Sequence, residues 1–222
     1  MASSRYGSQR AILNGVIALT LMATPALSDP IRIAALGDSL TQGFGLPPQD
    51  GLVPQLQRWL DAQGAQVVVV NAGVSGDTTA GGLARLDWTL TDDTDALIVA
   101  LGGNDMLRGI DPTAVRTNLD AILTQAQARA LPTLLVGTQA PQNFGPAYKS
   151  AFDALFPALA ETHGALFHPN LLAPLLAIED RATARRDYLQ ADQLHPNAAG
   201  VALIVTALGP AVLDLVSAVT PD

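Results

Sequence analysis

Three side chains that could together carry out acyl transfer lie near opposite ends of the sequence. Ser39 directly follows an apolar run, whereas Asp192 and His195 stand three residues apart near the C-terminus. A serine hydroxyl becomes nucleophilic when a histidine takes its proton, and a carboxylate can fix the tautomer of that histidine. We therefore predict Ser39 as nucleophile, His195 as base and Asp192 as its orienting group. Taken singly, Ser39 fits a helix N-cap equally well, and Asp192 fits an ordinary turn.

Two further loops could stabilise the negative charge that such a reaction creates. Asn104 lies behind two glycines after another apolar run, so its amide could donate to an oxyanion. Gly76 could offer a backbone N–H as a second donor, although each loop alone also fits a simple turn. His163 and His168 are rival bases, but neither has an aspartate three residues before it. Too few convergent ligands are present to predict a metal site.

Short apolar runs and longer amphipathic ones alternate along the chain and must position these residues. We expect buried strands at residues 31–36, 67–70, 96–101, 133–137 and 165–167, and helices at 53–63, 79–90, 112–130, 147–163 and 197–217. Strands rich in Val, Ile and Leu without polar alternation are typical of a parallel sheet covered on both faces. In such an α/β fold the functional loops converge at the carboxyl ends of the strands.

Composition narrows the class of protein. The 222 residues are enough for one domain, and 49% hydrophobic with 14% charged residues indicates a folded chain. A formal charge of -8 disfavours nucleic acid as a partner. The chain has no cysteine, which excludes disulfides, thiolate metal sites and a cysteine nucleophile.

The N-terminus has the pattern of a secretory signal. Arg5 and Arg10 precede an apolar run over residues 11–23, and small residues suited to cleavage follow at Ala26 and Ser28. We predict a signal peptide at 1–28 and a single domain at 29–222, exported to the periplasm or secreted, with an uncleaved anchor as the alternative. The mature protein is expected to be a monomer with no stable membrane insertion.

Taken together, four segments resemble the SGNH (or GDSL) hydrolase family and occur in that family's order. They are Gly37-Asp38-Ser39-Leu40, the segment around Gly76, Gly102-Gly103-Asn104-Asp105, and Asp192-Gln193-Leu194-His195-Pro196. The resemblance implies a flavodoxin-like, three-layer α/β/α fold with a five-stranded parallel sheet. It also implies no metal, no organic cofactor, and an oxyanion hole made by Ser39 N–H, Gly76 N–H and the Asn104 side chain.

Segments 71–78 and 103–109 are most similar to the bacterial acyl-thioesterase, arylesterase and lysophospholipase branch of that family. This resemblance implies a serine esterase whose partner is a small acyl or aryl ester, with thioesters and lysophospholipids as further substrates. Residues 138–148 resemble the acyl-binding loop of the branch through Pro141, Asn143 and Phe144. Ala140 stands where a larger aliphatic residue is expected, which predicts a shortened acyl groove.

Two other functions fit parts of the sequence. A carbohydrate O-acetyl esterase could use the same triad, but only 5% of residues are aromatic, and Trp59 and Trp88 fall in predicted helices as expected core residues. A non-catalytic exported binding module could use the glycine-rich loops for a phosphate. However, Gly43 and Gly45 lead into Pro47 rather than into a helix, so neither common phosphate-loop pattern is present.

Overall fold

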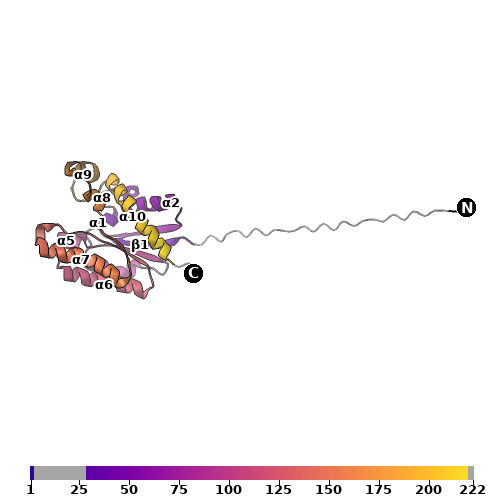
Figure 1. Ribbon diagram of the computed structural model, residues 1–222, viewed down its shortest axis with the longest axis horizontal. Helices are drawn as coiled ribbons and strands as arrows, with labels where there is room; N and C mark the ends of the chain where they lie inside the picture. The colour runs from indigo at the N-terminus through magenta and orange to yellow at the C-terminus, as the bar shows by residue number, and fades with distance from the viewer. Residues whose placement is uncertain (3–28, 220–222) are drawn as a thin grey trace.

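A computed structural model of the chain describes residues 1–2 and 29–219 (Figure 1). Its strands are β1 (Ile31–Gly37), β2 (Val67–Gly73), β3 (Ala96–Ala100), β4 (Thr133–Val136) and β5 (Leu166–His168). Its α-helices are α1 (Ser39–Gln42), α2 (Leu52–Ala62), α3 (Thr79–Ala84), α4 (Leu86–Thr89), α5 (Gly103–Leu107), α6 (Pro112–Ala128), α7 (Gly145–His163), α8 (Ala173–Leu176), α9 (Arg181–Tyr188) and α10 (Ala198–Ala218). Two 3-10 helices are η1 (Pro48–Asp50) and η2 (Gln142–Phe144). The signal peptide predicted at 1–28 lies outside the described residues, except for the first two.

All neighbouring strands are parallel, in the order β2-β1-β3-β4-β5. This is the strand order of flavodoxin-like folds, with the change of winding direction beside β1. The predicted α/β/α fold with a five-stranded parallel sheet is therefore confirmed. The same topology brings the loops after β1, β2 and β3 to one edge of the sheet.

The sheet separates two hydrophobic cores. Successive residues of β1 alternate between them, with Ile33 and Ala35 facing α2 and α10 while Ala34 and Leu36 face α6 and α7. Figure 1 shows the two pairs of helices on opposite sides of the strands. Because both faces of each inner strand are buried, the strand sequences lack the polar alternation of a half-exposed sheet.

The C-terminal helix α10 supplies one wall of a core. Asn197 caps it by accepting hydrogen bonds from the backbone N–H groups of Ala199 and Gly200, both at 3.0 Å. Within the described parts of the chain, α10 is the one helix long and apolar enough to cross a membrane. Its buried residues, including Val205 and Val212, pack in the core shared with α2 and the sheet, so core packing accounts for its composition.

The structure corrects two sequence-based expectations about helices. The helix predicted at 79–90 divides at Arg85 into α3 and α4, because the Arg85 backbone leaves helical geometry while its guanidinium reaches back to the Gly37 carbonyl. The short helices α1, α5, α8 and α9 were not predicted.

The two tryptophans have different environments. Trp59 packs in the core against Gly209 of α10, as expected. Trp88 is 88% exposed, so its predicted core role is wrong. The reason is that α4 spans only four residues and buries Leu86 rather than the indole.

Candidate active site

Ser39 is the first residue of α1, and only Asp38 separates it from the end of β1 at Gly37. The Asp38 carboxylate caps this short helix by accepting a hydrogen bond from Leu40 N–H at 2.9 Å. Asp38 is therefore the N-cap, which removes the alternative that Ser39 serves as one. The buried Thr41 side chain lies against Gly37, where any added Cβ would collide with it. A glycine at 37 is thus required for the turn that presents Ser39 at the edge of the sheet.

The three residues of the predicted triad are joined by hydrogen bonds. His195 Nε2 lies 2.9 Å from Ser39 Oγ, and His195 Nδ1 lies 2.6 Å from an Asp192 carboxylate oxygen. The other Asp192 oxygen accepts bonds from the backbone N–H groups of Leu194 and His195, both at 3.0 Å. The His195 side chain and these backbone donors lower the pKa of Asp192 to about 2. Asp192 is consequently ionised at neutral pH and can hold the imidazole with its Nε2 lone pair toward Ser39.

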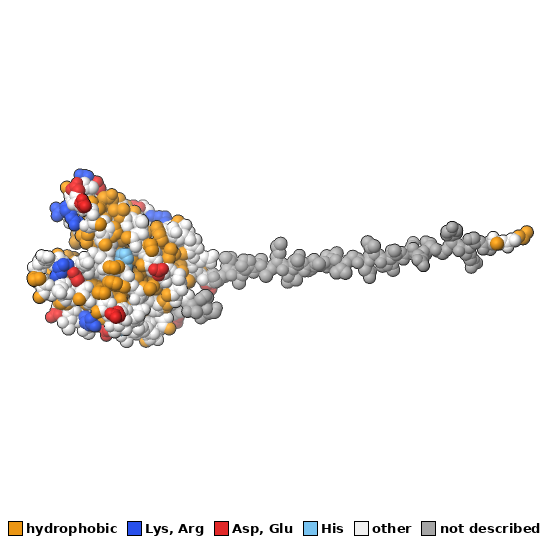
Figure 2. Space-filling view, in the orientation of Figure 1, with side chains coloured by type: hydrophobic (Ala, Val, Ile, Leu, Met, Phe, Trp, Pro, Cys, Tyr) orange, Lys and Arg blue, Asp and Glu red, His pale blue; other side chains and the backbone are white. Residues whose placement is uncertain are grey.

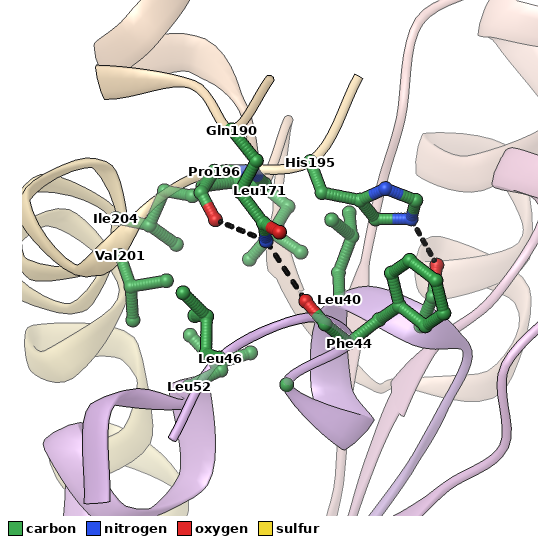
Figure 3. A pocket seen from close by; sticks show the side chains of 12 residues that line it. Leu40, Phe44, Leu46, Leu52, Leu171, Gln190, His195, Pro196, Val201 and Ile204 are labelled. Atoms are coloured by element: carbon green, nitrogen blue, oxygen red, sulfur yellow. Dashed lines mark hydrogen bonds between the residues drawn. The ribbon is translucent and has the colours of Figure 1, made fainter. Parts of the chain in front are cut away.

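Gln190 joins the histidine loop to the serine turn. Its side-chain amide donates to the Phe44 carbonyl at 2.8 Å and to the Pro196 carbonyl at 2.9 Å (Figure 3). Its backbone N–H donates to the His195 carbonyl at 2.8 Å, which closes the turn that carries Asp192. The Phe44 ring also packs against the imidazole, with ring centroids 4.8 Å apart. These contacts fix His195 relative to the turn that presents Ser39.

Beneath these hydrogen bonds the side chains pack closely around a small apolar pocket of about 10 Å³. Leu46, Leu171, Val201 and Ile204 are among its lining residues, and Figure 3 shows Leu46, Val201 and Ile204 on the side of Gln190 away from the imidazole. The serine turn and the histidine loop therefore both pack against the hydrophobic core that α10 shares with α2 and the sheet.

Asn104 and Gly76 lie at the same edge of the sheet as Ser39, and all three line one cleft. The Asn104 amide donates to the Asp38 carboxylate at 3.3 Å, which orients it toward the serine turn. Gly76 has φ of 82°, and its N–H donates to no acceptor among the described residues. Burial raises the pKa of Asp38, although Leu40 N–H, His195 and Asn104 act in the opposite direction. The Asn104 amide and the Gly76 N–H therefore lie at the cleft that contains Ser39.

Two polar links brace the loops that carry these donors. The fully buried Asp105 accepts from the backbone N–H of Thr79 at 2.8 Å and from its hydroxyl at 2.7 Å, which ties the loop after β3 to that after β2. Arg85 forms a 2.6 Å ion pair with Asp77 and donates to the Gly37 carbonyl at 3.0 Å. Sequence analysis missed Gln190, Thr79 and Arg85 because their partners are mostly backbone groups or residues distant in the chain.

The cleft itself has a volume of about 280 Å³ and a largely apolar lining. Beside Ser39 and His195 it is bounded by Phe44, Met106, Leu107, Thr138, Leu172 and Leu194. Ligand pockets in proteins commonly combine such apolar walls with a few polar groups at the reacting centre. Groups of three or more His, Asp or Glu that could hold a metal ion are absent from residues 1–2 and 29–219.

Within the loop predicted to bind the acyl chain, Thr138 lines this cleft, whereas Pro141, Asn143 and Phe144 do not. Pro141, Asn143 and Phe144 are exposed, and the Phe144 ring packs against Tyr148 at 5.2 Å between centroids. Their part in substrate binding stays a prediction. Ala140 is only 2% exposed and belongs to a hydrophobic core, so it does not line this cleft, and the shortened acyl groove stays a prediction. Its small size instead suits the packing beneath the loop.

The two rival histidines, His163 and His168, have surroundings that do not include Ser39. His163 Nε2 lies 2.8 Å from an Asp120 oxygen, and its Nδ1 lies 2.9 Å from Gln127 Oε1. His168 is half-buried in β5, and this burial lowers the pKa of its imidazole. Neither forms a hydrogen bond with Ser39 among the described residues, so His195 is the histidine that the fold brings to the serine.

The fold and this constellation define a serine hydrolase built on a flavodoxin-like sheet. The chain belongs to the GDSL-like lipase/acylhydrolase family, whose model matches residues 35–203. The family resemblance inferred from the motifs is therefore confirmed. The chain is a serine esterase, as its sequence predicted.

Named relatives span most of the chain. Esterase TesA of Pseudomonas aeruginosa is 37% identical over 186 residues, covering 83% of this chain and 88% of the relative. Thioesterase 1/protease 1/lysophospholipase L1 of Escherichia coli K12 is 33% identical over 183 residues, covering 82% of this chain and 81% of the relative. Among solved structures, the psychrotrophic esterase EstA of Pseudoalteromonas sp., inhibited by monoethylphosphonate, superposes with a TM-score of 0.75 at 32% identity. That match covers 82% of this chain and 97% of EstA.

Proposed function

We propose that Ser39, His195 and Asp192 hydrolyse carboxylic esters through an acyl-serine intermediate. The observation that carries this proposal is the chain of short contacts from Asp192 through His195 to Ser39. In the first step His195 Nε2 takes the hydroxyl proton while Ser39 Oγ bonds to the substrate carbonyl carbon. The carbonyl oxygen then carries the negative charge of a tetrahedral intermediate.

We assign the stabilisation of that oxyanion to three donors, namely Ser39 N–H, Gly76 N–H and the Asn104 amide. The intermediate collapses when the carbon–oxygen bond to the leaving group breaks and His195 gives its proton to the departing oxygen. Water then attacks the acyl-serine with His195 again as base, which releases the carboxylic acid and restores Ser39. Ionised Asp192 stabilises the imidazolium that forms in both halves of the reaction.

The substrates we propose are small-molecule acyl and aryl esters, with thioesters and lysophospholipids as further members. The apolar walls of the cleft support acyl binding, and two relatives carry the names esterase and thioesterase/lysophospholipase. His195 can give its proton to a departing thiol as it does to a departing alcohol, so a single site can serve both bonds.

The test is hydrolysis of p-nitrophenyl esters from acetate to palmitate by residues 29–222. We expect release of p-nitrophenol by the wild type and its near-complete loss in Ser39→Ala. The matched control is Ser217→Ala, which removes an exposed hydroxyl bonded only to the Leu213 carbonyl of α10. Equal activity of Ser39→Ala and the control would exclude Ser39 as nucleophile, and absence of activity in the folded wild type would exclude the proposed substrate class.

We also propose that residues 1–28 direct export and are removed, leaving a single domain at 29–222 in the periplasm or outside the cell. The basic start, the apolar run and the small residues before position 29 support this proposal. N-terminal sequencing of the protein recovered outside the cytoplasm should begin at Asp29. A product that retains Arg5 and Arg10 would favour the uncleaved anchor instead.

A further inference from the structure

A second hollow extends the catalytic cleft toward α9. Leu172 and Leu194 line both the cleft that contains Ser39 and this neighbouring hollow of about 340 Å³. The floor of the second hollow includes Leu175, Leu176 and Leu189, and Leu176 is 49% exposed. Because the two spaces share these two leucines, they adjoin each other, and together they are called the apolar groove below.

Two arginines stand at the far side of this groove. Arg181 and Arg185 are one helical turn apart on α9, and both line the second hollow. Figure 2 shows hydrophobic side chains on the surface below the lobe of α9, with charged side chains at its tip. Neither arginine forms an ion pair or side-chain hydrogen bond with any residue in the described ranges, whereas the adjacent Arg186 is paired with Asp187 at 2.7 Å.

Their position favours an anionic ligand. The chain has 20 acidic against 12 Lys and Arg residues, so two neighbouring guanidinium groups without acidic partners are unusual on its surface. Planar guanidinium groups match the geometry of phosphate and carboxylate oxygens and can bind them with paired hydrogen bonds. The groove therefore joins an apolar path at one end to an anion-binding pair at the other.

The groove lies on the leaving-group side of the reaction. Gln193 and Leu194 line it and directly precede His195, which must give its proton to the departing oxygen. The leaving group consequently lies on the imidazole side of Ser39, and a long one would extend over Leu194 toward α9. We propose that Arg181 and Arg185 select esters whose leaving group is an apolar chain ending in a phosphate or carboxylate. This proposal rests on the esterase activity proposed above.

The kinetic test uses three acetate esters that differ only at the far end of the leaving group. The probes are acetylated ω-hydroxydodecanoate, its uncharged methyl ester, and the acetate of dodecanediol monophosphate, each below its micelle concentration. We expect the wild type to prefer a charged probe by about tenfold in kcat/KM, since exposed charge pairs are partly screened. In the double variant Arg181→Gln/Arg185→Gln this preference should disappear, while the control Arg186→Gln should keep it.

A binding measurement separates the groove from the chemistry. Calorimetry with dodecanediol monophosphate on Ser39→Ala should give affinity about tenfold higher than on the same chain with both arginines replaced. Preference for the phosphate probe alone, or for the carboxylate probe alone, identifies which anion the pair accepts. The proposal is overturned if the wild type hydrolyses charged and uncharged probes with equal kcat/KM. It is also overturned if dodecanediol monophosphate binds with equal affinity with and without the two arginines. If no probe is hydrolysed but binding of dodecanediol monophosphate still depends on the two arginines, only the esterase mechanism is contradicted.

Discussion

Replacing Gln190 by methionine tests whether the link between the histidine loop and the serine turn acts in catalysis. Methionine keeps the length of the side chain but cannot donate to the Phe44 and Pro196 carbonyls, which accept bonds of 2.8 and 2.9 Å. At about 1 kcal/mol net for each hydrogen bond, the loss is about 2 kcal/mol. For a domain of this size that corresponds to a decrease in Tm of about 4–8 °C.

The same loss should reach the chemical step. The backbone bond from Gln190 N–H to the His195 carbonyl is kept, so the turn persists but its docking on Phe44 weakens. In the variant, His195 must first return to hydrogen-bonding distance of Ser39. If this adds about 1.4 kcal/mol to the activation free energy, kcat falls about tenfold. KM should stay unchanged, because Gln190 does not line the cleft that would hold the acyl group.

The matched control is Gln57→Met on α2. The Gln57 amide donates to the Val67 carbonyl at 2.9 Å and accepts from Val69 N–H at 2.8 Å, far in the sequence from the triad loops. It should lower Tm by a similar amount and leave kcat unchanged. The assays are thermal unfolding by circular dichroism and hydrolysis of p-nitrophenyl acetate. A Gln190→Met enzyme with lowered Tm but wild-type kcat would refute the positioning role and leave Gln190 a purely structural residue.

Three further changes have defined outcomes. Asn104→Ala should lower kcat by about 10²–10³-fold with little change in Tm, and unchanged turnover would remove Asn104 from the oxyanion hole. Asp38→Asn keeps the acceptor for Leu40 N–H but removes a buried carboxyl whose pKa is raised. Since ionisation of that carboxyl is disfavoured in the folded state, wild-type stability relative to Asp38→Asn should decrease as pH rises from about 4 through the raised pKa; a difference in Tm that does not vary with pH contradicts this. Gly37→Ala should cost about 1–3 kcal/mol because its Cβ meets Thr41, and Thr41→Gly in the same chain should restore much of that loss; urea unfolding of the single and double variants measures both.

The sheet was predictable because its strands are buried on both faces. Continuous apolar runs such as residues 96–101 have few alternative structures in a chain of this length. The end of β2 was not predictable in the same way. Residues 71–73 carry polar or small side chains, and they join the strand because their backbones pair with Ala35–Gly37 of β1.

The candidate site was predictable to the extent that its residues form short motifs. Ser39, Asn104 and the Asp192–His195 pair each sit in a recognisable segment, so the fold had only to bring those segments together. Gln190 has no such signal, since an isolated glutamine in a loop acquires its role from two backbone carbonyls that the sequence does not mark.

The environment of a single side chain depended on packing that local sequence does not encode. Ala140 was placed in an acyl groove by resemblance, yet it fills a core position beneath the neighbouring loop. Trp88 was assigned to a core from an expected helix over 79–90, and the break at Arg85 turns it to solvent. Both environments come from tertiary contacts between segments distant in the chain.

The most direct test of the central claim is to map the residue modified by a p-nitrophenyl alkylphosphonate. Such a reagent phosphonylates an activated serine and releases one p-nitrophenol for each molecule modified. Peptide mass spectrometry should find the phosphonyl group on Ser39, with loss of esterase activity in proportion to modification. Inactivation with the label on another residue, or full activity with Ser39 labelled, would contradict the assignment of Ser39 as the nucleophile.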